Sequence, residues 1–322
     1  MTRISIITVN WNGKRWLDTC LTSVSNQELS EEFEIILVDN GSIDDSVKFV
    51  RENFPKIKVV ALDRNYGFAE GNNIGIREAK GEYLIFVNTD TRVETCWLKN
   101  LVDAAEENPE YKILCSIQLP SMKANILAID HFFGLTKISY FRTSKDILES
   151  NFAHGGCFLL RKDWLAKVGY LFNPSYFYFG EDLDLSLRTI LAGGKIGYVK
   201  KSRIWHFLGG SEYNESWLFR IMQINALRTY QKRFRRKFTK ILLIKFLFAL
   251  LIFVKAPAKI KANIGNLTGL IDFMIYRRNF VSKDKIFNKF HGNAILTERE
   301  LLQKISYQGS IGKLVKRFIL NV

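Results

Sequence analysis

Residues 33–42 read FEIILVDNGS, an aliphatic run that ends abruptly at a polar turn. Residues 4–13, near the start of the chain, read ISIITVNWNG and show the same pattern of an apolar run followed by a polar turn. Short apolar runs bounded by polar turns are typical of buried strands. Between the two runs, residues 16–27 (WLDTCLTSVSNQ) have the spacing of a helix. The chain therefore begins with a predicted strand–helix–strand unit.

The same alternation continues along the first two thirds of the sequence. Strands alternating with helices predict an α/β domain with a mainly parallel, Rossmann-like sheet. Residues 118–150 read as irregular. The further strands are predicted at residues 58–62, 83–87, 158–160 and 196–199, and the further helices at 44–53, 67–80, 97–108, 162–168 and 182–192.

The charge divides the chain into two parts. The formal net charge is +15, but residues 1–200 hold 23 Lys/Arg and 26 Asp/Glu, a net of −3, whereas residues 201–322 hold 24 and 6, a net of +18. This asymmetry predicts a nearly neutral domain over residues 1–215 and a separate basic, helical region over residues 216–322. A basic region can face nucleic acid, an anionic membrane or water, and composition does not choose among them.

Several protein classes are disfavoured by what the sequence lacks. The four cysteines show no CxxC spacing, which argues against a disulfide framework or a thiolate zinc site and favours a cytosolic setting. The first apolar run is too short for a signal peptide. No GxGxxG follows the first strand and no GxxxxGK[ST] occurs, so neither a nicotinamide dehydrogenase nor a P-loop enzyme is expected.

Polar residues follow four of the predicted strands. They are Asn10, Asp39, Asn65 and the stretch Asn88-Thr89-Asp90. In parallel sheets ligands bind at the carboxyl ends of the strands, so a site is expected there. Asp39 is suited to orient a nucleobase or ribose, but it also fits an Asx turn that closes a strand.

Two of these segments have features of a phosphate-binding site. Residues 65–75 (NYGFAEGNNIG) form a helix entry rich in glycine and asparagine, where Gly67 allows close approach of a ligand or simply tight packing. Asp90 is suited to bind a divalent cation that bridges two phosphates, and Asn88 can assist through its carbonyl oxygen. A cap at a strand-to-helix turn explains the same Asp90 equally well.

Residues 178–185 (YFGEDLDL) place three carboxylates within four residues behind an aromatic run. Glu181 and Asp182 can cap the following helix, where the helix dipole favours negative charge. Partial burial beside the aromatic run would instead raise a carboxylate pKa and produce a better general base. Asp182 and Asp184 point to different sides of a helix, so they need different partners. His206 follows the last predicted strand and, as a lone histidine, is more often structural than a ligand.

Taken in order, a set of motifs resembles the family 2 glycosyltransferases of GT-A fold, most closely the branch of rhamnosyltransferases and galactofuranosyltransferases. The resemblance covers residues 3–212 and lies in the order of the motifs, since no single motif carries it. The motifs are SIITVNWNG, VDNGSIDDS, NYGFAEGNNIG, FVNTD, GGCFLLRKDWLAKVG, YFYFGEDLDLSLR and HFLGGS.

The resemblance implies an inverting transfer from a nucleotide-diphosphate sugar to an acceptor hydroxyl. Asp182 matches the family's catalytic base, with Glu181 and Asp184 as supporting groups that bind acceptor hydroxyls or position the loop. Asp90 matches the second acid of the family's DxD motif and would bind Mg²⁺ or Mn²⁺, with His206 as a further metal ligand. Asn88 replaces the first acid of that motif, which weakens any expectation of two carboxylate ligands.

The donor would be held by residues from several motifs. The resemblance assigns the nucleoside to the first strands and the nucleotide side of the site to the asparagines of the helix entry. The glycine pair of the GGCFLL motif would let the backbone approach the donor sugar. The residues implied are Thr8, Asn10, Asp39, Gly67, Asn72, Asn73, Asn88, Gly155 and Gly156.

The basic region suggests a membrane surface as partner. Residues 231–240 (QKRFRRKFTK) carry six cations before the apolar run 241–254, which only Lys245 interrupts. As a helix this run spans about 21 Å, short of the ~30 Å of a hydrocarbon core. Residues 231–261 are therefore expected to lie in the interface at the cytoplasmic face of the cell membrane. Packing on protein, homodimerisation and a true span remain alternatives.

The sequence thus predicts a metal-dependent hexosyltransferase that extends a glycan or lipid-linked glycan in surface-polysaccharide synthesis, with rhamnose as the suggested sugar. A nucleotidyltransferase of similar fold is the alternative within the fold, although the glycine-rich, basic loop after the first strand is absent. A nucleic-acid-binding protein that uses the basic region is a further alternative. Nucleic acid is the poorer fit, because the cations alternate with long aliphatic runs and no binding module frames them.

Overall fold

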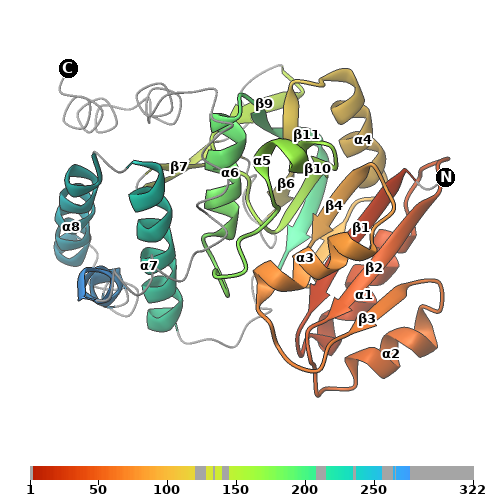
Figure 1. Ribbon diagram of the computed structural model, residues 1–322. Coiled ribbons are helices and arrows are strands. Elements are labelled where there is room, and N and C mark those ends of the chain that lie inside the picture. The colour runs from red at the N-terminus through yellow and green to blue at the C-terminus, as the bar shows by residue number, and fades with distance from the viewer. Residues whose placement is uncertain are drawn as a thin grey trace.

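The structure, a computed structural model, describes residues 3–119, 128–132, 135–139, 145–207, 215–234, 237–255, 264 and 266–275. In this part of the chain nine strands form one twisted sheet, and helices cover both of its faces (Figure 1). The sheet order is β3-β2-β1-β4-β10-β6-β11-β5, with β9 paired to β11 outside this path. The expected α/β fold is confirmed.

One half of the sheet is parallel. It contains β3 (Lys58–Ala61), β2 (Phe33–Asp39), β1 (Ile4–Asn10) and β4 (Tyr83–Val87). These are the four strands that the apolar runs predict. Because all four point the same way, their polar ends share one edge, where Asn10 lies directly opposite Asp39.

The other half is mixed. β10 (Cys157–Arg161) lies antiparallel between β4 and β6 (Tyr111–Leu119), and β6 pairs in parallel with β11 (Lys195–His206). Two short strands, β5 (Thr91–Val93) and β9 (Ile147–Ser150), pair antiparallel with β11. A separate hairpin contains β7 (Ala128–Phe132) and β8 (Leu135–Ser139).

The expectation that residues 118–150 are irregular was wrong for the described part of that range. It contains the end of β6, the β7–β8 hairpin and β9. β9 is a strand because its backbone pairs with β11, almost fifty residues later in the chain. The last predicted strand, 196–199, is also longer than expected, so His206 ends the strand rather than following it.

The helices connect these strands and differ from the predicted ones mainly at their ends. The described residues 266–275 are also helical after the last named helix. The helices are α1 (Lys14–Ser25), α2 (Ser46–Asn53), α3 (Phe68–Glu78), α4 (Trp97–Glu107), α5 (Trp164–Val168), α6 (Glu181–Leu191), α7 (Glu215–Arg233) and α8 (Phe238–Lys255).

The core lies in two layers, one on each face of the sheet. Successive side chains of a strand point to opposite faces, so Ile6 and Ile7 enter different layers. The layer that contains Ile6 packs against α1 and α4, through residues such as Leu17 and Leu98. The layer that contains Ile7 packs against α3 and α6. Both faces are thereby buried, as a parallel sheet requires.

Helix α7 belongs to the second of these layers. Its residues Ile224, Leu227 and Tyr230 are buried in the same hydrophobic cluster as Phe86 of β4. The first helix of the basic region therefore packs on the sheet domain. The division into residues 1–215 and 216–322 stays a prediction.

A buried ion-pair cluster joins α6 to α7. The Asp184 side chain is fully buried, and its two carboxylate oxygens accept hydrogen bonds from Arg188 Nε at 2.8 Å and from Arg233 Nη2 at 3.1 Å. Burial alone would raise the pKa of Asp184, but the two guanidinium groups lower it below its ordinary value. Tyr170 also donates to Asp184, at 3.2 Å. One carboxylate thus ties together two helices and the chain segment before α6.

We predict that Asp184→Asn destabilises the fold by about 3–5 kcal/mol at pH 7, because it leaves two buried arginines without their counter-ion. The loss should shrink as the pH falls below about 3.9, the ordinary aspartate pKa. The wild-type carboxylate has a lowered pKa, so it contributes stability at higher pH and loses that contribution on protonation. Urea unfolding at several pH values measures this difference.

Asp103→Asn is the matched control for that prediction. Asp103 pairs with Lys99 one helical turn away on an exposed face, so its loss should change the free energy of unfolding by less than about 1 kcal/mol. Equal effects of the two variants would contradict the role given to the Asp184 cluster.

Candidate active site

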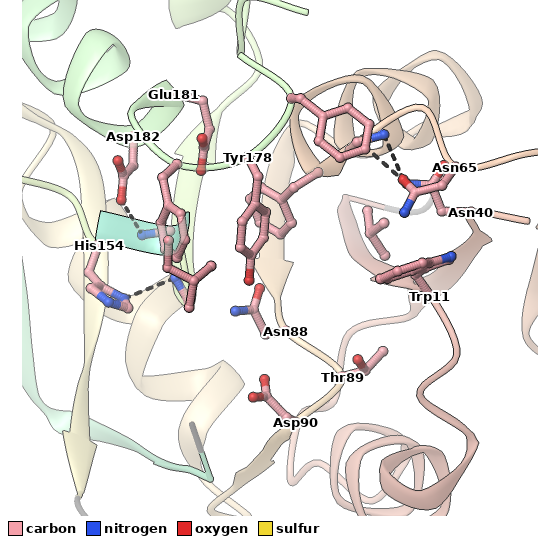
Figure 2. A pocket seen from close by; sticks show the side chains of 18 of the residues that line it. Trp11, Asn40, Asn65, Asn88, Thr89, Asp90, His154, Tyr178, Glu181 and Asp182 are labelled. Atoms are coloured by element: carbon pink, nitrogen blue, oxygen red, sulfur yellow. Dashed lines mark hydrogen bonds between the residues drawn. The ribbon is translucent and has the colours of Figure 1, made fainter. Parts of the chain in front are cut away.

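A cleft of about 330 Å³ opens at the carboxyl ends of β1 and β4. Figure 2 shows Asp182 and His154 at one end of the cleft and Trp11, Asn40 and Asn65 at the other, with Asn88 and Tyr178 between them. The predicted site residues that line it are Gly67, Asn88, Asp90, Gly155, Gly156, Glu181, Asp182 and His206. Thr8, Asn10, Asp39, Asn72, Asn73 and Asp184 do not line it.

Asp39 and Asn10 end the neighbouring strands β2 and β1 and bond to each other. Asn10 Nδ2 donates to Asp39 Oδ2 at 2.9 Å, and the other Asp39 oxygen accepts from the Ser42 backbone N–H at 2.9 Å. Both side chains are buried. Thr8 Oγ1 and Asn10 Oδ1 are buried atoms without a hydrogen-bond partner among the described residues. These two buried oxygen atoms therefore accept no hydrogen bond from the described residues.

Asn40, which the sequence analysis missed, organises the neighbouring loop. Its amide donates to Asn65 Oδ1 and to the Gly67 carbonyl, at 3.0 and 3.1 Å, and its Oδ1 accepts from the Tyr66 N–H. A side chain at Gly67 would approach Phe177 to 2.5 Å, at a backbone φ of +88°. Gly67 therefore permits a close approach between two segments of the protein.

Asn72 and Asn73 bond to backbone groups of the protein and do not line the cleft. Asn72 Nδ2 donates to the Phe68 carbonyl at 2.9 Å. Asn73 exchanges two hydrogen bonds with the Phe172 backbone and so fixes α3 against the segment that precedes α6. Their assignment to the nucleotide stays a prediction.

The acidic helix start contributes two carboxyl groups to the cleft. Neither serves as a helix cap, since α6 is preceded by Gly180 and shows no side-chain capping bond. Asp182 accepts hydrogen bonds from the backbone N–H groups of Leu183 at 2.7 Å and Gly155 at 3.4 Å. The chain reaches this helix through Phe179, whose φ of 63° is rare for a bulky residue. Backbone strain thus accompanies the placement of these acids.

The two adjacent acids have raised pKa values. Burial raises the pKa of Asp182 to about 6, and its backbone hydrogen bonds oppose that change in part. Burial and the neighbouring Asp182 charge raise the pKa of Glu181 well above its ordinary value. Glu181 Oε2 is buried without a partner among the described residues. At neutral pH this geometry favours one ionised and one protonated carboxyl group.

A second polar group contains Gln118 of β6, His206 of β11, Asp90 after β4 and His154 before β10. Asp90 Oδ1 is 3.1 Å from His206 Nε2, and both side chains are largely buried. Gln118 bonds to both His206 and His154. Burial and the nearby His206 imidazole lower the pKa of His154 to about 4. The sequence analysis missed His154, although it directly precedes the glycine pair of a motif that the analysis used.

Asp90 and His206 fit part of a divalent-metal site. Two neighbouring ligands of an octahedral ion, each about 2.1 Å from it, lie about 3 Å apart, close to the observed 3.1 Å. No cluster of three or more metal-binding side chains is found in the part of the chain that the structure describes. A cation here would need further oxygen ligands, which a diphosphate and water can supply.

Aromatic side chains line the cleft as well. Trp11 lies at the end with Asn40 and Asn65, whereas Tyr178 lies over the middle (Figure 2). Phe177 and Phe179 come from the same segment as Tyr178. Trp11 and Phe177 line the cleft and are 36% and 44% exposed, and aromatic side chains of this kind stack on flat bases and on the apolar faces of sugars.

Several known proteins are similar to this chain in sequence. The chain is 35% identical over 121 residues to the uncharacterized glycosyltransferase YfnE of Bacillus subtilis, a match covering 36% of this chain and 30% of the relative. It is 31% identical over 116 residues to the cholesterol galactosyltransferase of Borreliella burgdorferi, covering 35% of this chain and 32% of that protein. Each match thus covers about a third of the relative.

Solved structures show the same fold. GalNAc-T7 crystallised with UDP, GalNAc and Mn²⁺ is 20% identical with a TM-score of 0.55, and the match covers 72% of this chain and 50% of that chain. Staphylococcus aureus TarS, residues 1–349 in complex with UDP, is 16% identical with a TM-score of 0.54, with coverage of 86% and 92%. The rhamnosyltransferase and galactofuranosyltransferase branch stays a prediction.

The family model "Glycosyl transferase family 2" matches residues 5–169, just over half of the chain. This range includes β1 to β4, with Asp39 and Asp90, and β10, but it ends before α6. Together with the GT-A-like architecture of the solved neighbours, the match shows that this chain belongs to glycosyl transferase family 2.

Proposed function

We propose that the protein transfers a sugar from a nucleotide-diphosphate sugar to a hydroxyl group of a glycan or lipid-linked glycan, with inversion at the anomeric carbon. The observation that carries this proposal is the cleft itself. It holds a carboxylate with a raised pKa, Asp182, together with the Asp90–His206 pair. A base for the acceptor and a cation site for the leaving diphosphate are the two groups that this reaction needs.

Asp182 is the proposed base. With a pKa of about 6 it is mainly ionised at pH 7 and still basic enough to accept the proton of a sugar hydroxyl as the new bond forms. The acceptor oxygen bonds to the anomeric carbon, the bond from that carbon to the diphosphate oxygen breaks, and its electron pair leaves with the diphosphate. Glu181 keeps its proton and donates a hydrogen bond to a substrate oxygen.

Asp90 and His206 are the proposed ligands of Mg²⁺ or Mn²⁺, with Asn88 beside them on the cleft wall. When bound, the cation offsets the negative charge that grows on the departing diphosphate. The glycine pair 155–156 leaves room for the donor sugar next to the acids. A side-chain carbon at Gly155 would lie 3.6 Å from the nearer Asp182 carboxylate oxygen and 3.8 Å from that of Glu181.

The opposite end of the cleft is the proposed nucleoside site. The buried atoms Thr8 Oγ1 and Asn10 Oδ1 have no partner among the described residues, but neither residue lines the cleft, so their assignment to the nucleoside rests on the family motifs. The assignment of Asp39 to the nucleoside rests on the same motifs, and Trp11, which lines this end of the cleft, is proposed to contact the base. Rhamnose remains the suggested sugar.

The acceptor is proposed to be presented at a membrane surface. In α8, Ile241 and Ile244 are buried, whereas Leu243 and Leu247 are 48% and 51% exposed. Lys245, which interrupts the apolar run in the sequence, does not lie on the exposed face of α8. It is buried, donates to Gln223 Oε1 at 2.6 Å, and has its pKa lowered to about 7 by burial.

We therefore propose that the exposed apolar face of α8 lies on the anionic cytoplasmic face of the cell membrane, together with the cations of residues 231–240 other than Arg233, which is paired with Asp184. Residues 235, 236 and 256–261 of the predicted membrane-binding segment lie outside the described residues. No helix among the described residues is both long and apolar enough to span a bilayer. A second copy of the chain is the alternative occupant of this face.

The enzyme should release a nucleoside diphosphate from one member of a panel of nucleotide sugars, given membrane extract as acceptor source and Mg²⁺ or Mn²⁺, and a chelator should stop the release. Asp182→Asn should lower kcat about 100- to 10,000-fold with nucleotide binding retained, because the amide cannot accept the proton. Asp163→Asn, at an exposed carboxylate, is the matched control. If Asp182→Asn stays active, the base lies elsewhere.

The pH–rate profile should show an acid limb near pH 6. The base acts in its ionised form, and the pKa of Asp182 is raised to about 6, so kcat falls up to tenfold per pH unit below that value. Glu181→Gln should keep this limb, since the amide replaces a carboxyl group that is already neutral. A limb near pH 4 in the wild type would argue against a buried base.

Leu243→Glu with Leu247→Glu should lower binding to phosphatidylserine vesicles at least tenfold in a flotation assay, because two apolar contacts with the membrane are lost. Ile43→Glu is the matched control, since Ile43 is 91% exposed in the loop before α2. If the double variant instead separates a dimer into monomers and leaves flotation unchanged, the apolar face is a contact between copies of the chain.

A further inference from the structure

Gln118, near the end of β6, lies between two histidines of the cleft. Its Nε2 is 2.6 Å from His154 Nδ1, and its Oε1 is 3.2 Å from His206 Nδ1. The backbone N–H of Gly156 donates to the same His154 Nδ1 at 3.0 Å. One glutamine and one backbone group therefore decide how both imidazoles are oriented.

The backbone bond fixes the positions of the protons. A peptide N–H can only donate, so His154 Nδ1 accepts and carries no proton. Gln118 must then present its NH₂ group to His154, which places its Oε1 against His206. Because an amide oxygen can only accept, His206 Nδ1 carries a proton. The assignment follows from the network rather than from the placement of the glutamine alone.

The two imidazoles are thereby given opposite roles. In its neutral form His206, with its proton on Nδ1, directs the lone pair of Nε2 at Asp90 Oδ1, 3.1 Å away. Two acceptors at that distance repel each other unless a cation or a proton lies between them. His154, with its proton on Nε2, keeps an N–H donor, and that nitrogen has no partner among the described residues. His154 lines the cleft.

We propose that Gln118 is a positioning residue that sets opposite tautomers in His206 and His154. It makes His206 Nε2 a ligand toward the cation site that Asp90 shares, and it makes His154 a neutral hydrogen-bond donor to an oxygen of the bound nucleotide sugar. The inference rests on the proposed function only in taking a divalent cation as the occupant of the Asp90–His206 site.

Nitrogen NMR of ¹⁵N-histidine-labelled full-length protein at pH 8, with chelator present, tests the tautomers without any metal or substrate. The chain has four histidines, so the spectrum is simple, and His154→Asn and His206→Asn assign the two signals. We expect a protonated Nδ1 in His206 and an unprotonated Nδ1 in His154. The same protonation state at Nδ1 in both residues would overturn the inference.

Electron paramagnetic resonance of Mn²⁺ tests the positioning role. Gln118→Leu should weaken Mn²⁺ binding about 10- to 100-fold, the usual cost of losing a group that orients a metal ligand. Gln118→Glu should keep the wild-type affinity, because a carboxylate still accepts from His206 Nδ1. Gln27→Leu is the matched control. It removes a glutamine that bonds the backbone of Ser23, Glu94 and Leu98.

The outcomes separate this inference from the proposed function. Wild-type Mn²⁺ affinity in Gln118→Leu would overturn the positioning role and leave the proposed transfer reaction standing. Wild-type protein that does not bind Mn²⁺ at all would also overturn it. If both predictions hold while no nucleotide sugar is turned over, the inference stands as a description of a cation site and the proposed function fails.

Discussion

The buried ion pairs of Asp184 with Arg188 and Arg233 are the interaction on which the placement of helix α6 depends. They join α6 to α7, and Arg188 also donates to the carbonyls of Val168 and Tyr170 in the segment before α6. Charges are tolerated in a protein interior only when they are paired and hydrogen-bonded. This cluster therefore fixes where α6 begins, and with it the positions of Glu181 and Asp182.

The three acids of this helix start fall into two environments. Asp184 has two arginine partners and a lowered pKa, whereas Glu181 and Asp182 are buried at the cleft without a cation among the described residues and have raised pKa values. The same burial has opposite consequences because the counter-charges are on one side of the helix only. Three carboxylates within four residues thus combine a structural anchor with a pair suited to proton transfer.

Backbone N–H groups also position side chains of the cleft. Gly155 donates its N–H to Asp182, and Gly156 donates to His154. These adjacent residues precede β10, the antiparallel strand inserted between β4 and β6. Asp182 and the Asp90–His206 pair line one cleft, to which Asp90 comes from the end of β4 and His206 from the end of β11. The mixed half of the sheet is therefore as important for the site as the parallel half.

Local sequence pattern was sufficient for the parallel half of the fold. Apolar runs closed by polar turns predicted β1 to β4, and the motifs taken together with the family resemblance predicted eight residues that line the cleft. The pattern was insufficient where pairing is long-range. β9 is a strand because of β11, and the buried cation of Lys245 depends on contacts with Gln223 in α7.

The sequence by itself determined the alternation of strands and helices and the family resemblance, because these depend on residue types at short spacing, and it named several of the acids and glycines that line the cleft. Only the tertiary structure decided that Asp184 is an anchor, that Asn72 and Asn73 bond to backbone, and that His154, Gln118 and Asn40 organise the cleft. The physical reason is that a side chain's role depends on its partners and its burial. Both are set by segments that lie far apart in the chain.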